Sequence, residues 1–274
     1  IKAEAAKPQA DIMFSGINAG DGDSYEPYFE KYVSSHDSEL IEDCRNVNGY
    51  YNYVIISPSC FYVNKTLLKK QGITTPIKSY EDLLKPELKG LIVTSDPNSA
   101  SAGWNNFCNI LTCYGYEGED AWNYVDKLMA NGLVITSSSS TVFTSVSNGE
   151  YAIGLTYEGG AANEIRNGVD DCEIIFPEEG NGYIITAAAI VKGCPHPEAA
   201  AAWVEYTASS DAQAAWANGL GTTRVTNAQA KFETPYLQDF SSIKWKSRDI
   251  NWLTTNKKSL LEKWNSIYNK HNKK

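Results

Sequence analysis

The sequence is poor in the residues and motifs on which hydrolytic enzymes depend. It has three histidines among 274 residues, and His36, His196 and His271 lie in polar, proline-flanked or terminal contexts. A Ser/His/Asp or Cys/His arrangement therefore lacks a convincing general base. P-loop, G-x-G-x-x-G and G-x-S-x-G motifs are also absent. Hydrolase chemistry is disfavoured, although sequence leaves open a carboxylate pair such as Glu178 and Glu179, which we interpret as a solvated turn.

Long apolar runs and basic clusters are scarce as well. No apolar stretch approaches the roughly 18 residues that a membrane-spanning helix needs. There are 24 basic residues against 33 acidic ones, a formal net charge of −9. Because phosphate backbones demand clustered Lys and Arg, no nucleic-acid partner is expected. The composition, 42% hydrophobic and 21% charged, is that of an ordinary globular protein with one large domain or two smaller ones.

The cysteines indicate no metal site. None of the six forms a C-x-x-C pair or lies at metal-ligand spacing from a histidine, so a zinc site is not expected. We assign no metal ligand and no cofactor from the sequence. Cys108 and Cys113 fall in one predicted helix, whose rise holds their Cα atoms at least roughly 7.5 Å apart. We expect both to be free and buried, and disulfides among the other four stay open. We recognise no signal peptide, lipidation motif or retention signal in these residues, so they do not give the location directly, and a processed chain would look the same.

Apolar patterns predict an α/β protein. Residues 91–96 and 133–136 are short apolar strands, and 101–115 and 118–131 have apolar side chains at helical spacing. A strand, a serine-containing loop and a helix follow one another twice, and the strand "YAIGLTY" comes next. Alternating strands and helices favour layers around a sheet whose strands are largely parallel.

The serine-rich loops suggest a small-ligand site. A helix start leaves backbone N–H groups without partners and carries the positive end of the helix dipole. One N-cap satisfies the capping need, so the run 137–141 has surplus hydroxyls. A plain polar loop explains any single cluster, but "NSAS" at 98–101 and "FSG" at 14–16 occupy equivalent places after strands. Three such loops meeting at strand ends would form a cradle for an anion.

Three further residues have both a binding and an ordinary interpretation. Tyr157 and Glu158 end a strand of the same layer, where they could line the cradle or be a rim aromatic and a solvated acid. Arg224 follows a glycine turn and suits a phosphate or carboxylate, but a surface ion pair is the alternative.

The chain resembles the extracellular solute-binding proteins of bacterial ABC importers. The resemblance rests on "PQADIMFSG", "IISPSCFYVNKTLL", "SYEDLLKPELKGLIVTSDPNSASAGWN", "SSSSTVFTSVSNGEYAIGLTYEGGA", "IIFPEEG" and "AAAIVKGCPHPEAAAAWVEYTAS". It covers nearly the whole chain and is most specific over 79–180. The similar branch includes binders of iron, thiamine, phosphonates and sugar phosphates. The resemblance implies a type II periplasmic-binding-protein fold with two α/β lobes, 1–58 with 178–274 and 59–177, joined by a hinge of crossing strands.

The resemblance also implies a ligand cleft and a binding function without catalysis. The cleft residues would be Ser15, Gly16, Ser57, Ser59, Ser99, Ala100, Ser101, Ser138, Ser139, Ser140, Thr141, Tyr157, Glu158 and Arg224. Ferric binders of this branch carry two adjacent tyrosines where this chain has Tyr157 and Glu158. That departure favours an anionic solute, a phosphorylated sugar or polyol or a phosphonate, over ferric iron. The alternative from another class is a phosphoester-processing enzyme that uses the same cleft, and a third is a sensory ligand-binding module.

Family members normally begin with a strand, a helix and a strand that precede the "PQAD" segment, and this chain starts almost at that segment. A strand-helix-strand unit of the first lobe is therefore expected to be absent from it. The resemblance further implies an ABC permease and ATPase as partners, a monomer, and a periplasmic or cell-surface location. A lipid anchor in a preceding segment stays open, as does the identity of the ligand.

Overall fold

The computed structural model describes residues 1–18 and 25–272, and the chain divides into two compact units. Unit 1 comprises Ile1–Ser57 and Ile184–Pro235, and unit 2 comprises Pro58–Tyr183 and Tyr236–Lys274. The sequence assignment placed 236–274 in the first lobe. Those residues belong to unit 2, because Leu253, Leu260 and Trp264 join its hydrophobic core. The boundaries near 57 and 183 fall close to the expected 58 and 178.

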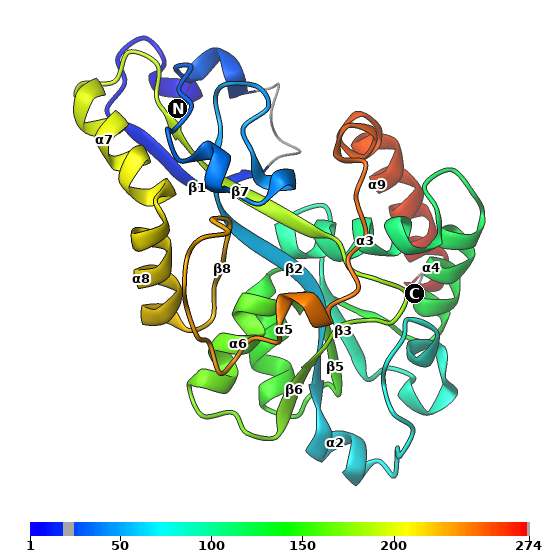
Figure 1. Ribbon diagram of the computed structural model, residues 1–274. Coiled ribbons are helices and arrows are strands. Elements are labelled where there is room, and N and C mark those ends of the chain that lie inside the picture. The colour runs from blue at the N-terminus through cyan, green and yellow to red at the C-terminus, as the bar shows by residue number, and fades with distance from the viewer. Residues whose placement is uncertain (19–24, 273–274) are drawn as a thin grey trace. The chain divides into compact units, whose positions relative to one another are not determined.

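Unit 1 is built on strands paired antiparallel, with two helices against them (Figure 1). Its elements are β1 (Ile12–Asn18), the first part of β2 (Asn52–Asn64), β7 (Tyr183–Ile190), β8 (Arg224–Val225), α7 (Pro197–Ala208) and α8 (Ser210–Leu220). Phe14 of β1 touches Trp203 of α7 and Trp216 of α8, with ring centroids 4.9 and 5.3 Å apart. These aromatic contacts hold both helices to the sheet.

Unit 2 has a mixed sheet in the order β2-β5-β3-β4, with β6 also paired to β2. Its strands are the second part of β2, β3 (Ile92–Ser95), β4 (Val134–Thr136), β5 (Ile153–Tyr157) and β6 (Cys172–Ile175). Its helices are α2 (Lys65–Lys70), α3 (Ser101–Tyr114), α4 (Asp120–Ala130), α5 (Ser139–Ser147), α6 (Glu158–Arg166) and α9 (Ile250–Asn272). Strands β3, β4 and β5 are mutually parallel as predicted, whereas β2 runs antiparallel to β5 and β6.

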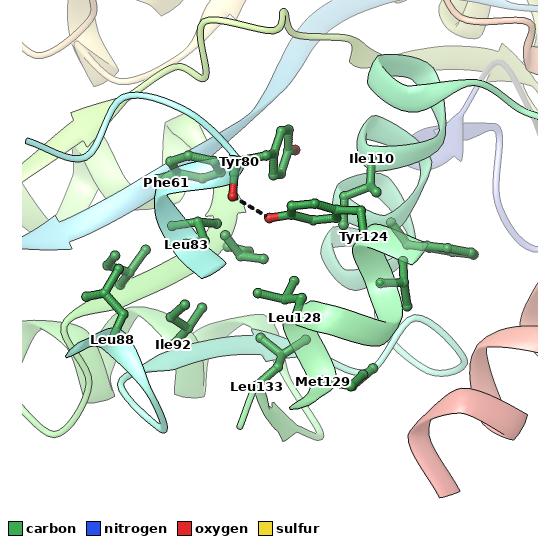
Figure 2. Packing of buried hydrophobic residues seen from close by; sticks show 14 of the residues in the cluster. Phe61, Tyr80, Leu83, Leu88, Ile92, Ile110, Tyr124, Leu128, Met129 and Leu133 are labelled. Atoms are coloured by element: carbon green, nitrogen blue, oxygen red, sulfur yellow. Dashed lines mark hydrogen bonds between the residues drawn. The ribbon is translucent and has the colours of Figure 1, made fainter. Parts of the chain in front are cut away.

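Helices cover both faces of the unit 2 sheet. Side chains alternate along β2, so Phe61 and Val63 enter the core under α3, α4 and α9, while Cys60 and Tyr62 face α5 and α6. Figure 2 shows the larger core, in which the Tyr124 hydroxyl donates to the Tyr80 carbonyl oxygen at 2.8 Å. The C-terminal helix α9 lies beside α4 (Figure 1). Within the described residues, no helix combines the length and apolarity required to cross a bilayer.

Candidate functional site

Three loops of unit 2 converge on one edge of its sheet. Strands β3, β4 and β5 are parallel and in register, with Ser95 opposite Thr136 and Thr94 opposite Leu155. Their carboxyl ends therefore lie side by side, and the next elements, α3, α5 and α6, all begin at this edge. The sequence-predicted residues of unit 2 other than Ser59 are brought together here, as the repeated strand-loop-helix pattern indicated. Ser59 lies on neighbouring strand β2, opposite Tyr157.

The serine run forms a connected group of hydroxyls at the start of α5. Ser138 is the N-cap, and its Oγ accepts a hydrogen bond from the Thr141 amide at 3.3 Å. The same oxygen lies 3.0 Å from Ser140 Oγ and 2.9 Å from Thr141 Oγ1. One hydroxyl therefore caps the helix, while Ser140 and Thr141 are exposed and can reorient toward a ligand.

The loop before α3 is held by hydrogen bonds to Asp96, whose side-chain Oδ1 accepts from the Asn98 amide at 2.9 Å. The Ser99 and Ala100 amides donate to the Asp96 carbonyl oxygen at 3.1 and 2.9 Å. Ala100 is the N-cap of α3, with no side-chain cap hydrogen bond. Ser101 is the first helical residue, and both Ser99 and Ser101 are exposed. An uncapped helix start with adjacent hydroxyls suits an anion.

Tyr157 and Glu158 mark the direct passage from β5 into α6. Tyr157 is half-buried, its ring packs against Phe143 with centroids 5.2 Å apart, and burial raises the pKa of its hydroxyl. Glu158 is only 1% exposed and is the first residue of α6, at the positive end of that helix dipole. The solvated-acid interpretation of Glu158 is therefore wrong, because its side chain is enclosed. Burial, and secondarily the Glu158 carboxyl, raises the pKa of the Cys60 thiol.

Two buried hydroxyls near this edge escaped sequence reasoning. Ser95 and Thr156 are 0% exposed, and neither side-chain oxygen has a hydrogen-bond partner within 1–18 and 25–272. They lie on the neighbouring parallel strands β3 and β5, and each is one residue beyond the Thr94 and Leu155 pair. An unpaired buried hydroxyl costs on the order of 1–3 kcal/mol. The only sequence signal was a polar residue at the end of each apolar strand.

The Ser59 hydroxyl accepts a hydrogen bond from Arg248, a residue that the sequence analysis did not single out. Ser59 is 1% exposed, and its Oγ donates to the Asn105 carbonyl oxygen at 3.4 Å. The Arg248 guanidinium donates to the same Oγ at 3.2 Å, to Asn109 Oδ1 at 3.0 Å, and to Asn105. Arg248 thus ties β2 to α3, and the Ser59 hydroxyl is occupied within unit 2.

The remaining predicted residues belong to unit 1. Ser15 and Gly16 were expected in a loop after a strand, but they lie within β1, at an irregularity of its pairing with β7 between Phe14, opposite Ala188, and Asn18, opposite Thr186. Their side chains lie outside the described part of the structure. Arg224 is 6% exposed and stands opposite Ile56, the residue before Ser57, in the pairing of β8 with β2. The surface ion-pair interpretation of Arg224 therefore does not hold.

The unit 2 edge combines the starts of α3 and α5 with hydroxyl groups, and N–H and O–H donors of this kind can bind negative charge. The start of α6 at the same edge already carries the enclosed Glu158 carboxyl. Among the described residues, no group of three or more His, Cys, Asp or Glu side chains is arranged to hold a metal ion. The six cysteines are free; Cys108 is buried as expected and Cys113 is partly exposed.

The chain is similar to known binding proteins. Residues 8–249 match the family model described as bacterial extracellular solute-binding protein. A protein of Haemophilus influenzae is 29% identical over 272 residues, 96% of this chain and 78% of that relative. The periplasmic binding protein AfuA of Actinobacillus pleuropneumoniae, solved with fructose-6-phosphate bound, is 26% identical with a TM-score of 0.83, covering 97% of this chain and 85% of that one. A periplasmic thiamin binding protein, 18% identical with a TM-score of 0.77 over 98% of this chain and 81% of that one, shares the fold.

Proposed function

Because the chain belongs to the family of bacterial extracellular solute-binding proteins, we propose that it captures a small phosphorylated sugar or polyol, or a phosphonate, for an ABC importer. The observation that carries the proposal is the convergence of the α3 and α5 starts and the Ser138–Thr141 hydroxyls on one edge of unit 2. The bound fructose-6-phosphate of AfuA supports the sugar-phosphate class.

The uncharged donors of this edge explain how an acidic protein could hold an anion. Backbone amides and hydroxyls act over short distances, and a helix dipole acts within its first turn. The net charge of −9 is spread over the whole surface and is screened by salt. Local geometry rather than net charge would therefore determine binding.

Ferric iron is the less favoured ligand. Among the candidate site residues, Tyr157 is the only phenol, and the next residue is Glu158 rather than a second tyrosine. Iron would have to take its other ligands from carboxylates, and the described residues hold no cluster suited to that. The hydroxyl-rich start of α5 has no role in such a site.

The family supplies the wider setting. Its members are extracytoplasmic binding proteins that present a small solute to a permease. We infer that this chain acts as a monomer, that its two lobes close over the solute, and that an ATPase drives the transport step. The inference includes delivery without chemical change of the ligand, since the family and its structural neighbours are binding proteins.

A thermal-shift screen with matched ligand pairs would test the proposal. The panel is fructose-6-phosphate with fructose, sorbitol-6-phosphate with sorbitol, aminoethylphosphonate, inorganic phosphate, thiamine and ferric citrate. A ligand at a hundred times its dissociation constant adds about 2.7 kcal/mol to the free energy of unfolding. We expect stabilisation by a phosphorylated or phosphonate compound and none by its unphosphorylated partner.

Two other results would contradict the proposal. A response to ferric citrate alone would assign Tyr157 and Glu158 to a metal site. Steady release of inorganic phosphate from a bound ester would show an enzyme instead of a binding protein.

A further inference from the structure

Unit 2 contains a pocket that shares only Ser99 with the proposed anion site. Its volume is about 270 Å³, just below the range of roughly 300–1,000 Å³ that is typical of small-molecule sites. It lies between the last turns of α9 and the loops that follow β3 and β4. The pocket borders the anion site at Ser99, but α9 supplies one of its walls and the anion site uses no residue of that helix.

A carboxylate on one wall has an unused oxygen. Asp96 Oδ1 accepts hydrogen bonds from the Asn98 backbone amide at 2.9 Å and from Asn98 Nδ2 at 2.7 Å. Across the described residues, Asp96 Oδ2 receives no hydrogen bond and the carboxylate forms no ion pair. The two bonds to Oδ1 fix the orientation of the carboxylate, so its negative charge is held in place at the pocket wall.

Reciprocal amide bonds join the loop to the helix. Asn98 Nδ2 donates to Asn265 Oδ1 at 3.0 Å, and Asn265 Nδ2 donates to Asn98 Oδ1 at 3.1 Å. Both side chains line the pocket. The pair ties α9 to the β3 loop next to Asp96, so the pocket has a fixed boundary.

The third wall is aromatic. Trp264 is 3% exposed, and its ring is held by Phe107, with centroids 4.9 Å apart. Tyr268 follows one helical turn later on the same wall, and its hydroxyl has no hydrogen-bond partner in the described residues. Trp264 is therefore the floor of this wall, and Tyr268 is its accessible ring. An aromatic ring beside a carboxylate favours a cation with little hydration.

The protein supplies no cation of its own to this pocket. No Lys or Arg is among the lining residues. The neighbouring lysines of α9 are engaged elsewhere, since Lys263 Nζ lies 4.5 Å from the Trp122 ring centroid and Lys270 Nζ donates to Asp126 at 2.7 Å. The Asp96 charge is therefore not neutralised by the residues that line the pocket.

We propose that this pocket binds a small alkylated ammonium compound, with its cationic head between Asp96 and Tyr268. The carboxylate supplies Coulomb attraction, and the Tyr268 ring replaces part of the weak hydration shell of the head group. Ser99, Thr136 and Ser137 line the pocket as well and can bind a hydroxyl of the same ligand. The site goes beyond the proposed function, because it needs no anionic ligand.

Calorimetric titration with choline tests the proposal, using the uncharged dimethylbutanol of the same shape as the matched ligand. We expect choline to bind and the alcohol to bind at least about tenfold more weakly, a difference of roughly 1.4 kcal/mol. Asp96→Asn keeps an acceptor for the Asn98 amide and removes the charge, so it should weaken choline binding by at least about tenfold. Asp170→Asn removes an exposed acid that does not line the pocket and should bind choline like the wild type.

Four outcomes would overturn the proposal. These are no heat with choline, equal binding of the uncharged alcohol, wild-type affinity in a folded Asp96→Asn protein, and competition between choline and a phosphorylated ligand for one site. Tyr268→Leu keeps an apolar side chain and provides a second variant if Asp96→Asn fails to fold. Choline binding does not depend on the phosphorylated ligand, so failure here and failure of the proposed function are distinguishable.

Discussion

Among single residues, Ser138 both caps a helix and belongs to the group of hydroxyls at the start of α5. Its Oγ caps α5 and also contacts the hydroxyls of Ser140 and Thr141. Ser137, by contrast, is exposed and takes no part in capping. Helix stability should therefore depend on Ser138, while the surplus hydroxyls remain for a ligand.

We expect Ser138→Ala to lower the free energy of unfolding by about 1 kcal/mol, because the Thr141 amide loses its cap. Ser137→Ala is the matched control and should leave that free energy within about 0.5 kcal/mol of the wild type. Urea unfolding followed by circular dichroism measures both. Equal effects of the two changes would refute the assignment of the cap.

Glu205 of α7 holds a segment of unit 1 through charge-assisted hydrogen bonds. Its carboxylate accepts from the Tyr32 hydroxyl at 2.7 Å, from Ser35 Oγ at 2.7 Å and from Ser34 Oγ at 3.0 Å. Burial by itself would raise the pKa of Glu205, but the hydrogen bonds from Tyr32, Ser35 and Ser34 lower it from 4.5 to about 2. Burial raises the pKa of the Tyr32 hydroxyl to about 12, and Glu205 adds to this rise.

A carboxyl group whose pKa is lower in the folded state than in the unfolded state stabilises the folded protein at pH values above the unfolded-state pKa. This contribution is lost as the pH falls toward the folded-state pKa. For Glu205 that window runs from pH 4.5 down to about pH 2. Glu205→Gln should therefore flatten the fall in stability across this window and cost on the order of 1–3 kcal/mol at neutral pH. Denaturant unfolding at several pH values measures this, and the exposed Glu198→Gln of the same helix is the control. An unchanged pH profile in the Glu205 variant would contradict the account.

Among the elements, the packing of α6 on α5 depends on a glycine. A Cβ at Gly160 would lie 2.1 Å from Cζ of Phe143. The Phe143 ring has no free space to move into, because it is 6% exposed and packs against Tyr157 and Tyr62. The close approach of the two helices therefore also sets the position of the Tyr157 ring.

Gly160→Ala should lower the free energy of unfolding by about 1–3 kcal/mol, since the added methyl overpacks this contact. Through Phe143 and Tyr157 it should also weaken the binding of the ligand that the thermal-shift screen identifies. Gly219→Ala is the control, because nothing lies within 4 Å of a Cβ there and α8 should gain up to about 1 kcal/mol. Thermal and urea unfolding measure the free energy of unfolding of both variants. A stable Gly160→Ala protein with wild-type affinity would show that the two helices can separate at no cost.

At the scale of the whole molecule, each unit has its own buried apolar residues. The larger cluster of unit 2 includes Leu128, which is 1% exposed, and in unit 1 Val204 and Ala188 are 0% exposed. A cavity made in one unit should therefore act first on the stability of that unit.

Leu128→Ala should lower the free energy of unfolding of unit 2 by about 2–5 kcal/mol. We expect the calorimetric transition to broaden or split, because unit 1 keeps all its contacts. Leu220→Ala is the control, since Leu220 is 37% exposed and contributes little to a core. One sharp transition at a lower temperature would mean that the two units unfold together.

Local pattern was enough to predict most elements of unit 2. Helical spacing predicted α3 and α4, and the repeated strand, serine loop and helix correctly placed β3, β4 and the start of α5. The sequence did not show that the Asp96 carboxylate accepts the Asn98 amide, or that α3 begins without a side-chain cap. A hydroxyl or carboxylate has the same local signal whether it caps a helix, binds a ligand or lies in water.

The sequence by itself determined the α/β class, the family and the position of the serine-rich helix starts, because these depend on periodicity and short motifs. Tertiary structure alone decided which polar groups are enclosed. Ser59 and Glu158 each have 1% exposure, and Arg248 reaches Ser59 from 189 residues away. The tertiary structure also placed α9 in unit 2 and formed the Asp96 pocket beside that helix. Such contacts join segments far apart in the chain, so no local pattern encodes them.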